Sequence, residues 1–325
     1  MKAKRIFSLR KLLVPAWKSL FLWVILTTMS FTAVQAKDAK ATFKEYFAEV
    51  RKGRSVTLPA GIFQPANEKV ILQTSVGYLA DSVDAVRSAA IYVIRSAGLM
   101  SKKADYRRQC VLYLLQACSD KNSGNSGQAS NYLTQFNPSD FNPSARDSLR
   151  KLLQANTPHI ANIIKLAGFV QLTDMISYMV DAIYGQPPKW KRINAWAAHL
   201  ALARMGVEDE INYCLNRVKK IPLNDDVVYN LLPDLIYTRQ KAIYDHLVSL
   251  LYIDEKLCNP ADPDADAKIS CGYRIMEMLA TEIKNFPLPV QPSGDIDTDD
   301  YHKALMTVRQ WFKDNPDYQI ITDKF

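Results

Sequence analysis

Residues 67–98 read NEKVILQTSVGYLADSVDAVRSAAIYVIRSAG, and this stretch decides the fold. In its second half, apolar residues recur at spacings of three and four, which places them on one face of a helix: Val83, Val86, Ala90, Val93, Ile94 and Ala97. Asp81 or Ser82 can cap the start of this helix, and Gly98 can close its end. We therefore predict a helix that begins near Asp81 and ends at Gly98.

The same periodicity continues on both sides of this stretch. It predicts helices at residues 41–51, 104–118, 187–205, 211–218, 225–238, 243–250, 271–283 and 299–314, with Pro233 kinking one of them. Others are expected to begin at Pro143, at Pro158 and at Thr173, the first two after the cap residues Asn142 and Thr157. Residues 119–130 are rich in Ser, Asn and Gly, which predicts a flexible loop. Short joints between helices predict an all-α fold of antiparallel neighbours.

Four residues of the opening stretch resemble the pattern of a HEAT repeat. In that pattern an apolar helix is followed by a turn with Asp and by a second helix that opens with Val-Arg-x-x-Ala. The matching positions are Asp81, Val86, Arg87 and Ala90. The resemblance implies a HEAT-like α-solenoid of stacked antiparallel hairpins, of HEAT or armadillo type, a fold used mostly to hold partners. It also implies a structural role for these four residues, and it does not extend to residues 253–325.

Residues 1–36 carry the pattern of a cleaved secretory signal peptide. Basic residues without any acid come first, an apolar run follows from Leu20 to Val34, and Val34-Gln35-Ala36 ends the segment with a small residue. We expect the mature chain to begin at Lys37; an uncleaved N-terminal anchor is the alternative. Behind the signal we expect a helical-repeat domain at 37–284, a Pro-rich linker at 285–297, and a C-terminal helix and tail at 298–325, of which residues 316–325 dock in extended form.

The signal accounts for most of the net charge. The whole chain has 41 basic and 33 acidic residues, and six basic but no acidic residues lie in 1–36. The remainder therefore carries 35 against 33, which gives no support to nucleic acid as a partner. We predict an exported protein, periplasmic or extracellular, with no stable membrane span after cleavage.

Export makes the five cysteines candidates for disulfides. Cys110 and Cys118 lie on one expected helix, separated by a rise of about 12 Å that no disulfide can bridge. Cys258 and Cys271 flank a loop rich in Pro and Asp and can close it as a disulfide. Five buried thiols are the alternative, and the odd count leaves at least one thiol outside any bond within the chain.

Motifs for catalysis, metals or cofactors are lacking. The four histidines (His159, His199, His246 and His302) have no metal-ligand spacing, and we interpret them as structural. Two acidic runs, at 262–266 and 295–300, lack the Gly and Glu that a calcium loop needs. We interpret them as a solvated loop and as carboxylates at the N-terminus of the 299–314 helix. We therefore predict no catalytic residue, no cofactor and no metal.

Aromatic residues crowd the central helices, where they serve either an interface, including a sugar-stacking surface, or packing between helices: Tyr178, Tyr184, Trp190, Trp196, Tyr213, Tyr229, Tyr237, Tyr244 and Tyr252. Together with the signal, this content favours a non-catalytic interaction scaffold that binds a protein or glycan in the cell envelope. One alternative is an exported all-helical enzyme of α/α-toroid type acting on polysaccharide. It would need paired carboxylates drawn from Asp174, Asp181, Glu208, Asp209 and Glu210. A third is a stabilising subunit of an envelope complex, docked through 298–325.

Overall fold

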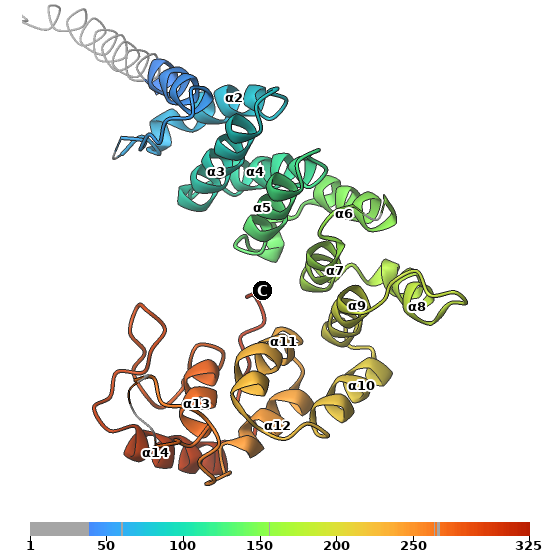
Figure 1. The fold of residues 1–325 in the computed structure, drawn as a ribbon, viewed down its shortest axis with the longest axis vertical. Coiled ribbons are helices and arrows are strands. Elements are labelled where there is room, and N and C mark those ends of the chain that lie inside the picture. Colours follow the sequence, from blue (N-terminus) through green and yellow to red (C-terminus); the bar gives the residue numbers. More distant parts are fainter. Residues whose placement is uncertain (1–38, 60, 156, 263, 265–266) are drawn as a thin grey trace, which may run out of the picture. The chain divides into compact units, whose positions relative to one another are not determined.

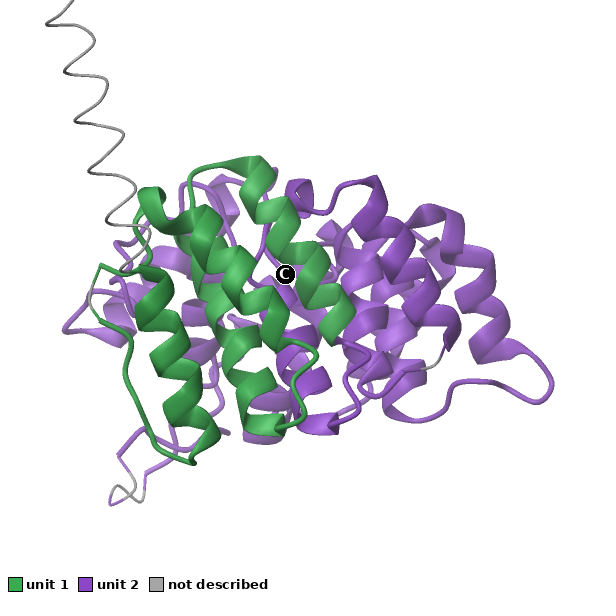
Figure 2. Ribbon diagram, turned by 90° about the horizontal axis from the view of Figure 1, so that it is seen from above, with its two compact units in different colours: residues 1–117 green, residues 118–325 purple. Residues whose placement is uncertain are grey.

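The computed structural model describes residues 39–325, except residues 60, 156, 263 and 265–266. The predicted signal at 1–36 lies outside this part of the chain. The described chain is all-helical, as predicted, with only isolated β-bridges in addition. It divides into two compact units, residues 1–117 and residues 118–325 (Figure 2).

The first unit holds a helix at residues 39–51 and three labelled α-helices: α2 (Glu68–Tyr78), α3 (Asp84–Met100) and α4 (Ala104–Ala117). A short 3-10 turn, η1 (Pro65–Asn67), precedes α2. Helix α3 packs against both α2 and α4 and is the most buried of the three, as the periodicity of 67–98 predicts. Phe47 stacks on Tyr78 with ring centroids 4.0 Å apart, which ties the 39–51 helix to the end of α2.

The start of α3 is set by the residues that resemble the HEAT pattern. The Asp81 carboxylate accepts a hydrogen bond from the Val83 main-chain N–H at 2.9 Å and an ion pair from Arg51. Arg87 is buried and donates to the Asp81 main-chain oxygen at 2.8 Å and to the Asp84 carboxylate at 2.7 Å. Val86 and Ala90, on the same helix, are inaccessible to solvent. The helix begins three residues after Asp81 and continues two residues beyond Gly98.

The second unit contains helices α5 to α14. Their bounds are α5 (Ser123–Leu133), α6 (Pro143–Ala155), α7 (Ile160–Phe169), α8 (Ile176–Tyr184), α9 (Ile193–Arg204), α10 (Glu208–Val218), α11 (Leu232–Tyr237), α12 (Lys241–Leu250), α13 (Gly272–Ala280) and α14 (Tyr301–Asp314). Short 3-10 turns at Pro138–Asp140 (η2) and Thr173–Met175 (η3) precede α6 and α8. Along α5, α7, α9 and α11 each helix contacts the next in this series, and α10 contacts α12 (Figure 1).

The closest helix packing in this unit is between α7 and α9, and a glycine permits it. A Cβ atom added to Gly168 would lie 2.8 Å from the Ala201 Cα and 2.5 Å from the Tyr237 hydroxyl. Main-chain atoms cannot move away as a flexible side chain can, so any side chain here would push the two helices apart.

The prediction of a loop at 119–130 is wrong, because α5 occupies Ser123–Leu133. Its first turn is capped by Asn122, whose side chain accepts a hydrogen bond from the Asn125 N–H at 3.1 Å. The hydroxyl of Ser130 donates to a carbonyl of the helix, and Leu133 is fully buried. The buried face of this helix is itself mostly small and polar, so its composition resembles that of a loop: Asn125, Ser126, Ala129, Ser130 and Leu133.

Three other helix boundaries differ from the prediction. Helix α7 begins at Ile160, because His159 has left-handed backbone with φ 57° and its ring donates to the Ser123 carbonyl at 2.8 Å. Helix α9 begins at Ile193 and not at residue 187, after two prolines that cannot donate main-chain hydrogen bonds. Helix α13 ends at Ala280, three residues short of Ile283.

The expected kink before Pro233 takes the form of a π-helical turn, η4 (Val227–Leu231), which leads into α11. Asn224 caps the segment by accepting from the Val227 N–H at 3.0 Å. Asn142 caps α6 in the same way, accepting from the Ala145 N–H at 2.9 Å.

The C-terminal tail docks in extended form within the second unit, as predicted. Ile320 pairs with Ile283 in an antiparallel bridge, and the flanking main chain adds a hydrogen bond of 2.8 Å from Ile321 to Glu282. Two buried arginines hold the end of the tail. Arg204 donates to the main-chain oxygens of Thr322 and Lys324 at 3.2 and 2.5 Å.

Arg239 is the second buried arginine that holds the tail. It donates to the main-chain oxygen of Phe325 at 3.2 Å and to the Tyr244 hydroxyl at 2.7 Å, and it forms an ion pair with Glu282. The Phe325 ring lies 5.2 Å from the ring of Tyr237, measured between centroids, and is tilted against it.

Candidate functional site

The strongest candidate site is a groove between α9 and α10, which we call the α9–α10 groove. Seven residues line its volume of about 520 Å³: Arg192, Ile193, Ala195, Trp196, His199, Tyr213 and Arg217. A volume in this range suits a small ligand or one residue of a larger one. The two helices are antiparallel neighbours joined by a short turn, so residues from the first turns of α9 meet residues from the later turns of α10 in the groove.

A buried histidine, His199, forms the floor of the groove, and a buried glutamate, Glu210, holds its ring. The Glu210 carboxylate accepts a hydrogen bond from the His199 Nδ1 at 2.5 Å, and the two residues are 2% and 7% exposed. The hydroxyl of Tyr184 donates to the other Glu210 oxygen at 3.0 Å, so both carboxylate oxygens are occupied. Burial and this bond raise the pKa of Tyr184 to about 12, so the phenol remains a donor.

This arrangement fixes the tautomer of His199. A carboxylate only accepts hydrogen bonds, so Nδ1 carries a proton and Nε2 is the acceptor of the neutral ring. Among the described residues, Nε2 has no hydrogen-bond partner, although the side chain is more than nine-tenths buried and lines the groove. A ligand can therefore donate to it.

Aromatic rings and two arginines form the walls. Tyr213 stacks on the His199 ring with centroids 4.0 Å apart and is itself 39% exposed. The guanidinium of Arg217 lies 5.1 Å from the centre of the Trp196 ring. The indole N–H of Trp196 donates to the Asp234 carboxylate at 2.7 Å, which fixes the ring from the α11 side.

Both arginines are exposed and neither has a carboxylate partner in the part of the chain that the structure describes. Arg192 precedes α9 with φ 52° and ψ −122°, a backbone conformation that costs a non-glycine residue free energy and that is often retained at binding sites. The first turn of α9 carries no acidic residue. The mouth of the groove is therefore positively charged.

Of the five carboxylates considered for an enzyme, all of which the structure describes, only Glu210 forms a hydrogen bond to a residue that lines this groove, His199. Glu208 and Asp209 lie exposed on the first turn of α10, and Asp181 is exposed on α8. Asp174 is held by Arg150 at 2.7 Å, which lowers the pKa of that carboxyl. The five do not converge on one cleft.

The remaining histidines lie apart from the groove. His159 contacts Ser123 at the start of α7, and His302 is exposed on α14. Burial and the neighbouring Lys219 lower the pKa of His246 on α12. Of the central aromatics, Trp190, Tyr237 and Tyr244 are buried in packing, whereas four are exposed: Tyr184, Tyr213, Tyr229 and Tyr252.

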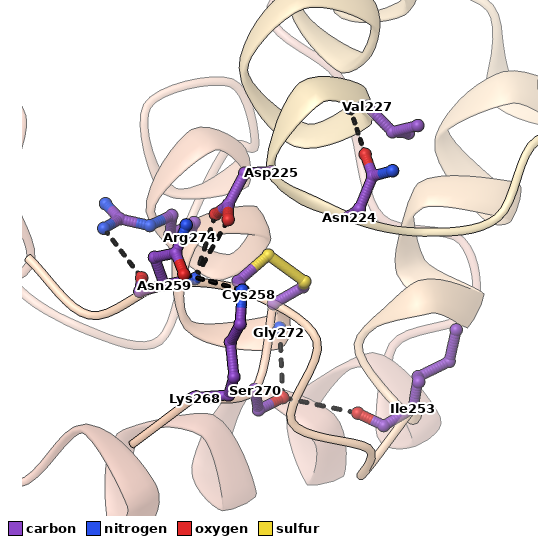
Figure 3. The surroundings of a disulfide bond; sticks show 11 residues. Asn224, Asp225, Val227, Ile253, Cys258, Asn259, Lys268, Ser270, Gly272 and Arg274 are labelled. Atoms are coloured by element: carbon purple, nitrogen blue, oxygen red, sulfur yellow. Dashed lines mark hydrogen bonds between the residues drawn. A yellow bond between two sulfur atoms is a disulfide. The ribbon is translucent and has the colours of Figure 1, made fainter. Parts of the chain in front are cut away.

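Cys258 and Cys271 are joined by a disulfide that closes the loop before α13 (Figure 3). The two strands of the loop also pair, with hydrogen bonds of 3.1 and 2.8 Å between Cys258 and Ile269. The Asn259 N–H donates to the Asp225 carboxylate at 3.1 Å, which attaches the loop to the start of the segment before α11. Cys110, Cys118 and Cys214 are buried thiols.

The two acidic runs differ in how much of them the structure describes. The run at 262–266 lies partly outside the described residues. In the run at 295–300, the Asp300 side chain caps α14 by accepting from the Lys303 N–H at 2.9 Å. No group of three His, Cys, Asp or Glu side chains within the described residues could hold a metal ion.

A second groove lies in the first unit, between α2 and α4, with a volume of about 970 Å³. Its buried carboxylate is already satisfied, because Glu68 accepts from the Ser101 hydroxyl at 2.6 Å and from Lys103 at 2.7 Å. These bonds outweigh burial and lower the pKa of Glu68. The polar floor of this groove thus offers less to a ligand than that of the α9–α10 groove.

Sequence reasoning missed Arg192 and Arg217 and interpreted His199 as structural. The two arginines are 25 positions apart and share no motif, and only the register of the α9–α10 hairpin brings them to one groove. Comparison with protein-family models, curated proteins and solved structures finds no match to this chain. No helix among the described residues has the length and apolar character to cross a bilayer.

Proposed function

We propose that the chain is an exported, non-catalytic, HEAT-like interaction scaffold that binds a protein or glycan partner in the cell envelope through the α9–α10 groove. Three features support the scaffold: paired helices that contact their next-but-one neighbours, the HEAT-like contacts of Asp81 and Arg87 before α3, and the signal pattern at 1–36. The observation that carries the binding site is the unpartnered Nε2 of His199 below the exposed Tyr213 ring.

An exported polysaccharide-cleaving enzyme is the second candidate, and the His199–Glu210 pair is the observation in its favour. Glycosidases of the usual kind place two carboxylates on either side of the scissile bond. Glu210 instead directs both oxygens to His199 and Tyr184. The groove therefore supports binding better than hydrolysis.

The test compares retention with turnover. The chain from Lys37 onward is immobilised and exposed to a soluble envelope fraction, and both the retained material and any new cleavage products are measured. Retention that is lost on Tyr213→Ala and kept on Tyr229→Ala supports the proposal, because Tyr229 is similarly exposed, at 49%, elsewhere in the same unit. If cleavage products form and the Glu210→Gln substitution abolishes them, the chain is an enzyme and the scaffold proposal is wrong.

A further inference from the structure

We infer that the ligand of the α9–α10 groove is an acidic sugar, a sugar residue bearing a carboxylate or a phosphate. This inference rests on the proposed function and names the chemistry of its partner. Three independent features of the groove each select one part of such a ligand: the arginines, the His199 acceptor and the Tyr213 ring.

The charge of the walls selects an anion. Arg192 precedes α9 and Arg217 lies in the last turn of α10; both line the groove, both are exposed and neither has a carboxylate partner among the described residues. Guanidinium groups bind carboxylates and phosphates with two parallel hydrogen bonds, so one anionic group between them is well matched. Glu210, the nearest buried carboxylate, does not compete, since His199 and Tyr184 occupy both of its oxygens.

The floor selects a ligand that also donates a hydrogen bond. Because Glu210 holds the proton on Nδ1, Nε2 of the neutral His199 ring is an acceptor, and the ring lines the groove. A sugar hydroxyl is such a donor, and it lies within a few bonds of the anionic group of the same residue. An ionised acidic side chain has no donor of its own, so an acidic peptide reaches this acceptor only through a main-chain N–H, whereas a sugar has hydroxyl donors beside its anionic group.

The ring of Tyr213 provides a stacking surface. One face covers His199 at 4.0 Å, and the ring is 39% exposed, so the other face is available to a ligand. Aromatic faces with a polar tip combine apolar contact with hydrogen bonding, which suits the apolar face and hydroxyl rim of a pyranose ring. The exposed side chain of Ile193 extends the apolar wall.

The experiment measures binding of four small probes to the chain from Lys37 onward by calorimetry. They are digalacturonic acid, galactose 6-phosphate, a neutral galactose disaccharide and a Glu-Glu dipeptide. We expect one or both acidic sugars to bind at least about tenfold more tightly than the neutral disaccharide and the dipeptide, since one charge-assisted bidentate contact accounts for a ratio of this size. The carboxylate and phosphate probes tell which anion is preferred.

Variants then locate the site. Arg217→Ala should weaken binding of the preferred acidic sugar by about tenfold or more. Arg150→Ala, which removes an arginine of the same unit already paired with Asp147 and Asp174, should leave binding unchanged. Equal or tighter binding of the dipeptide would overturn the inference in favour of an acidic peptide. Loss of all probe binding alongside persistent Tyr213-dependent retention of envelope material would refute the acidic sugar but not the scaffold.

Discussion

Replacing Arg204 with alanine should destabilise the second unit more than any exposed arginine of that unit can. Arg204 is 5% exposed and donates to three main-chain oxygens, of Tyr237 at 2.6 Å and of Lys324 and Thr322 in the tail. Its guanidinium also lies 4.7 and 5.0 Å from the centres of the Tyr237 and Phe169 rings. One side chain therefore joins the tail to α7 and α11.

The size of the effect follows from these contacts. A hydrogen bond from a charged donor contributes about 1.5–3 kcal/mol net, and a desolvated cation–π contact contributes up to about 2 kcal/mol. Against this stands the cost of burying the charge, which is visible in the lowered pKa of Arg204 and is recovered in the variant. We expect a net loss of about 3–5 kcal/mol, the range typical of large single-site effects.

Tryptophan fluorescence during urea unfolding is a suitable assay. The tryptophans of the described chain, Trp190, Trp196 and Trp311, all lie in the second unit, so the signal reports that unit alone. Hydrogen exchange over residues 319–325 gives a local readout, and it should accelerate in the variant because the tail loses two of its anchors. Arg150→Ala is the matched control and should cost less than about 1 kcal/mol, as exposed ion pairs do.

Two results would refute this reasoning. The first is a loss below about 1 kcal/mol for Arg204→Ala, within the range of an exposed pair. The second is unchanged exchange in the tail despite a large global loss, which would mean that Arg204 acts within α9 and not on the tail. Arg204→Lys separates charge from geometry, since an ammonium group cannot reach three oxygens in the planar arrangement of a guanidinium.

Three further predictions concern other parts of the chain. Gly168→Ala should lower the stability of the second unit by about 1–3 kcal/mol in the same urea assay, because the new methyl group meets main chain of α9; an unchanged midpoint would contradict that packing. Cys258→Ser should lower the free energy of unfolding by about 2–3 kcal/mol, the contribution of a disulfide that closes a loop of this length. The oxidised wild-type chain should show three titratable thiols when unfolded in denaturant, and a count of five would mean that the disulfide does not form. Glu68 has a lowered pKa in the folded chain, so its contribution to the free energy of unfolding is present above its unfolded pKa and is lost as the pH falls through the folded pKa. The melting temperatures of Glu68→Gln and wild type, measured by circular dichroism, should therefore converge in acid. A difference in melting temperature that stays constant with pH would contradict the ion pair with Lys103.

Local signals predicted most of the helices. Asn142 caps the helix that the sequence assigns to it, because the asparagine oxygen can satisfy a free N–H without any tertiary contact. The apolar face of α3 is likewise a local property, and its predicted members Val86 and Ala90 are inaccessible to solvent. Predictions failed where a distant residue decides, as at α7, whose start depends on the contact between His159 and Ser123.

The candidate site could not be predicted in the same way. His199 and Glu210 are 11 positions apart on different helices, and their contact depends on the turn between α9 and α10. The same holds for Arg192 and Arg217, which look like ordinary surface charges in the sequence. Glu210 was considered only as one of five carboxylates without a partner, and Trp196 and Tyr213 only as members of a long list of aromatic residues. The residue types can be read from the sequence, but the register between the antiparallel helices α9 and α10 cannot.

The second unit has two pairs of arginines, and they differ in whether the chain itself supplies partners for their charges. Arg204 and Arg239 are buried, and the chain itself supplies their partners, in main-chain oxygens and in Glu282. Arg192 and Arg217 line a groove together, yet within the described residues neither has a carboxylate, and repulsion between like charges makes such placement unfavourable for stability alone. The contact of Arg217 with the Trp196 ring accounts for part of its placement, but no described residue neutralises the two charges, whereas an acidic ligand between them does.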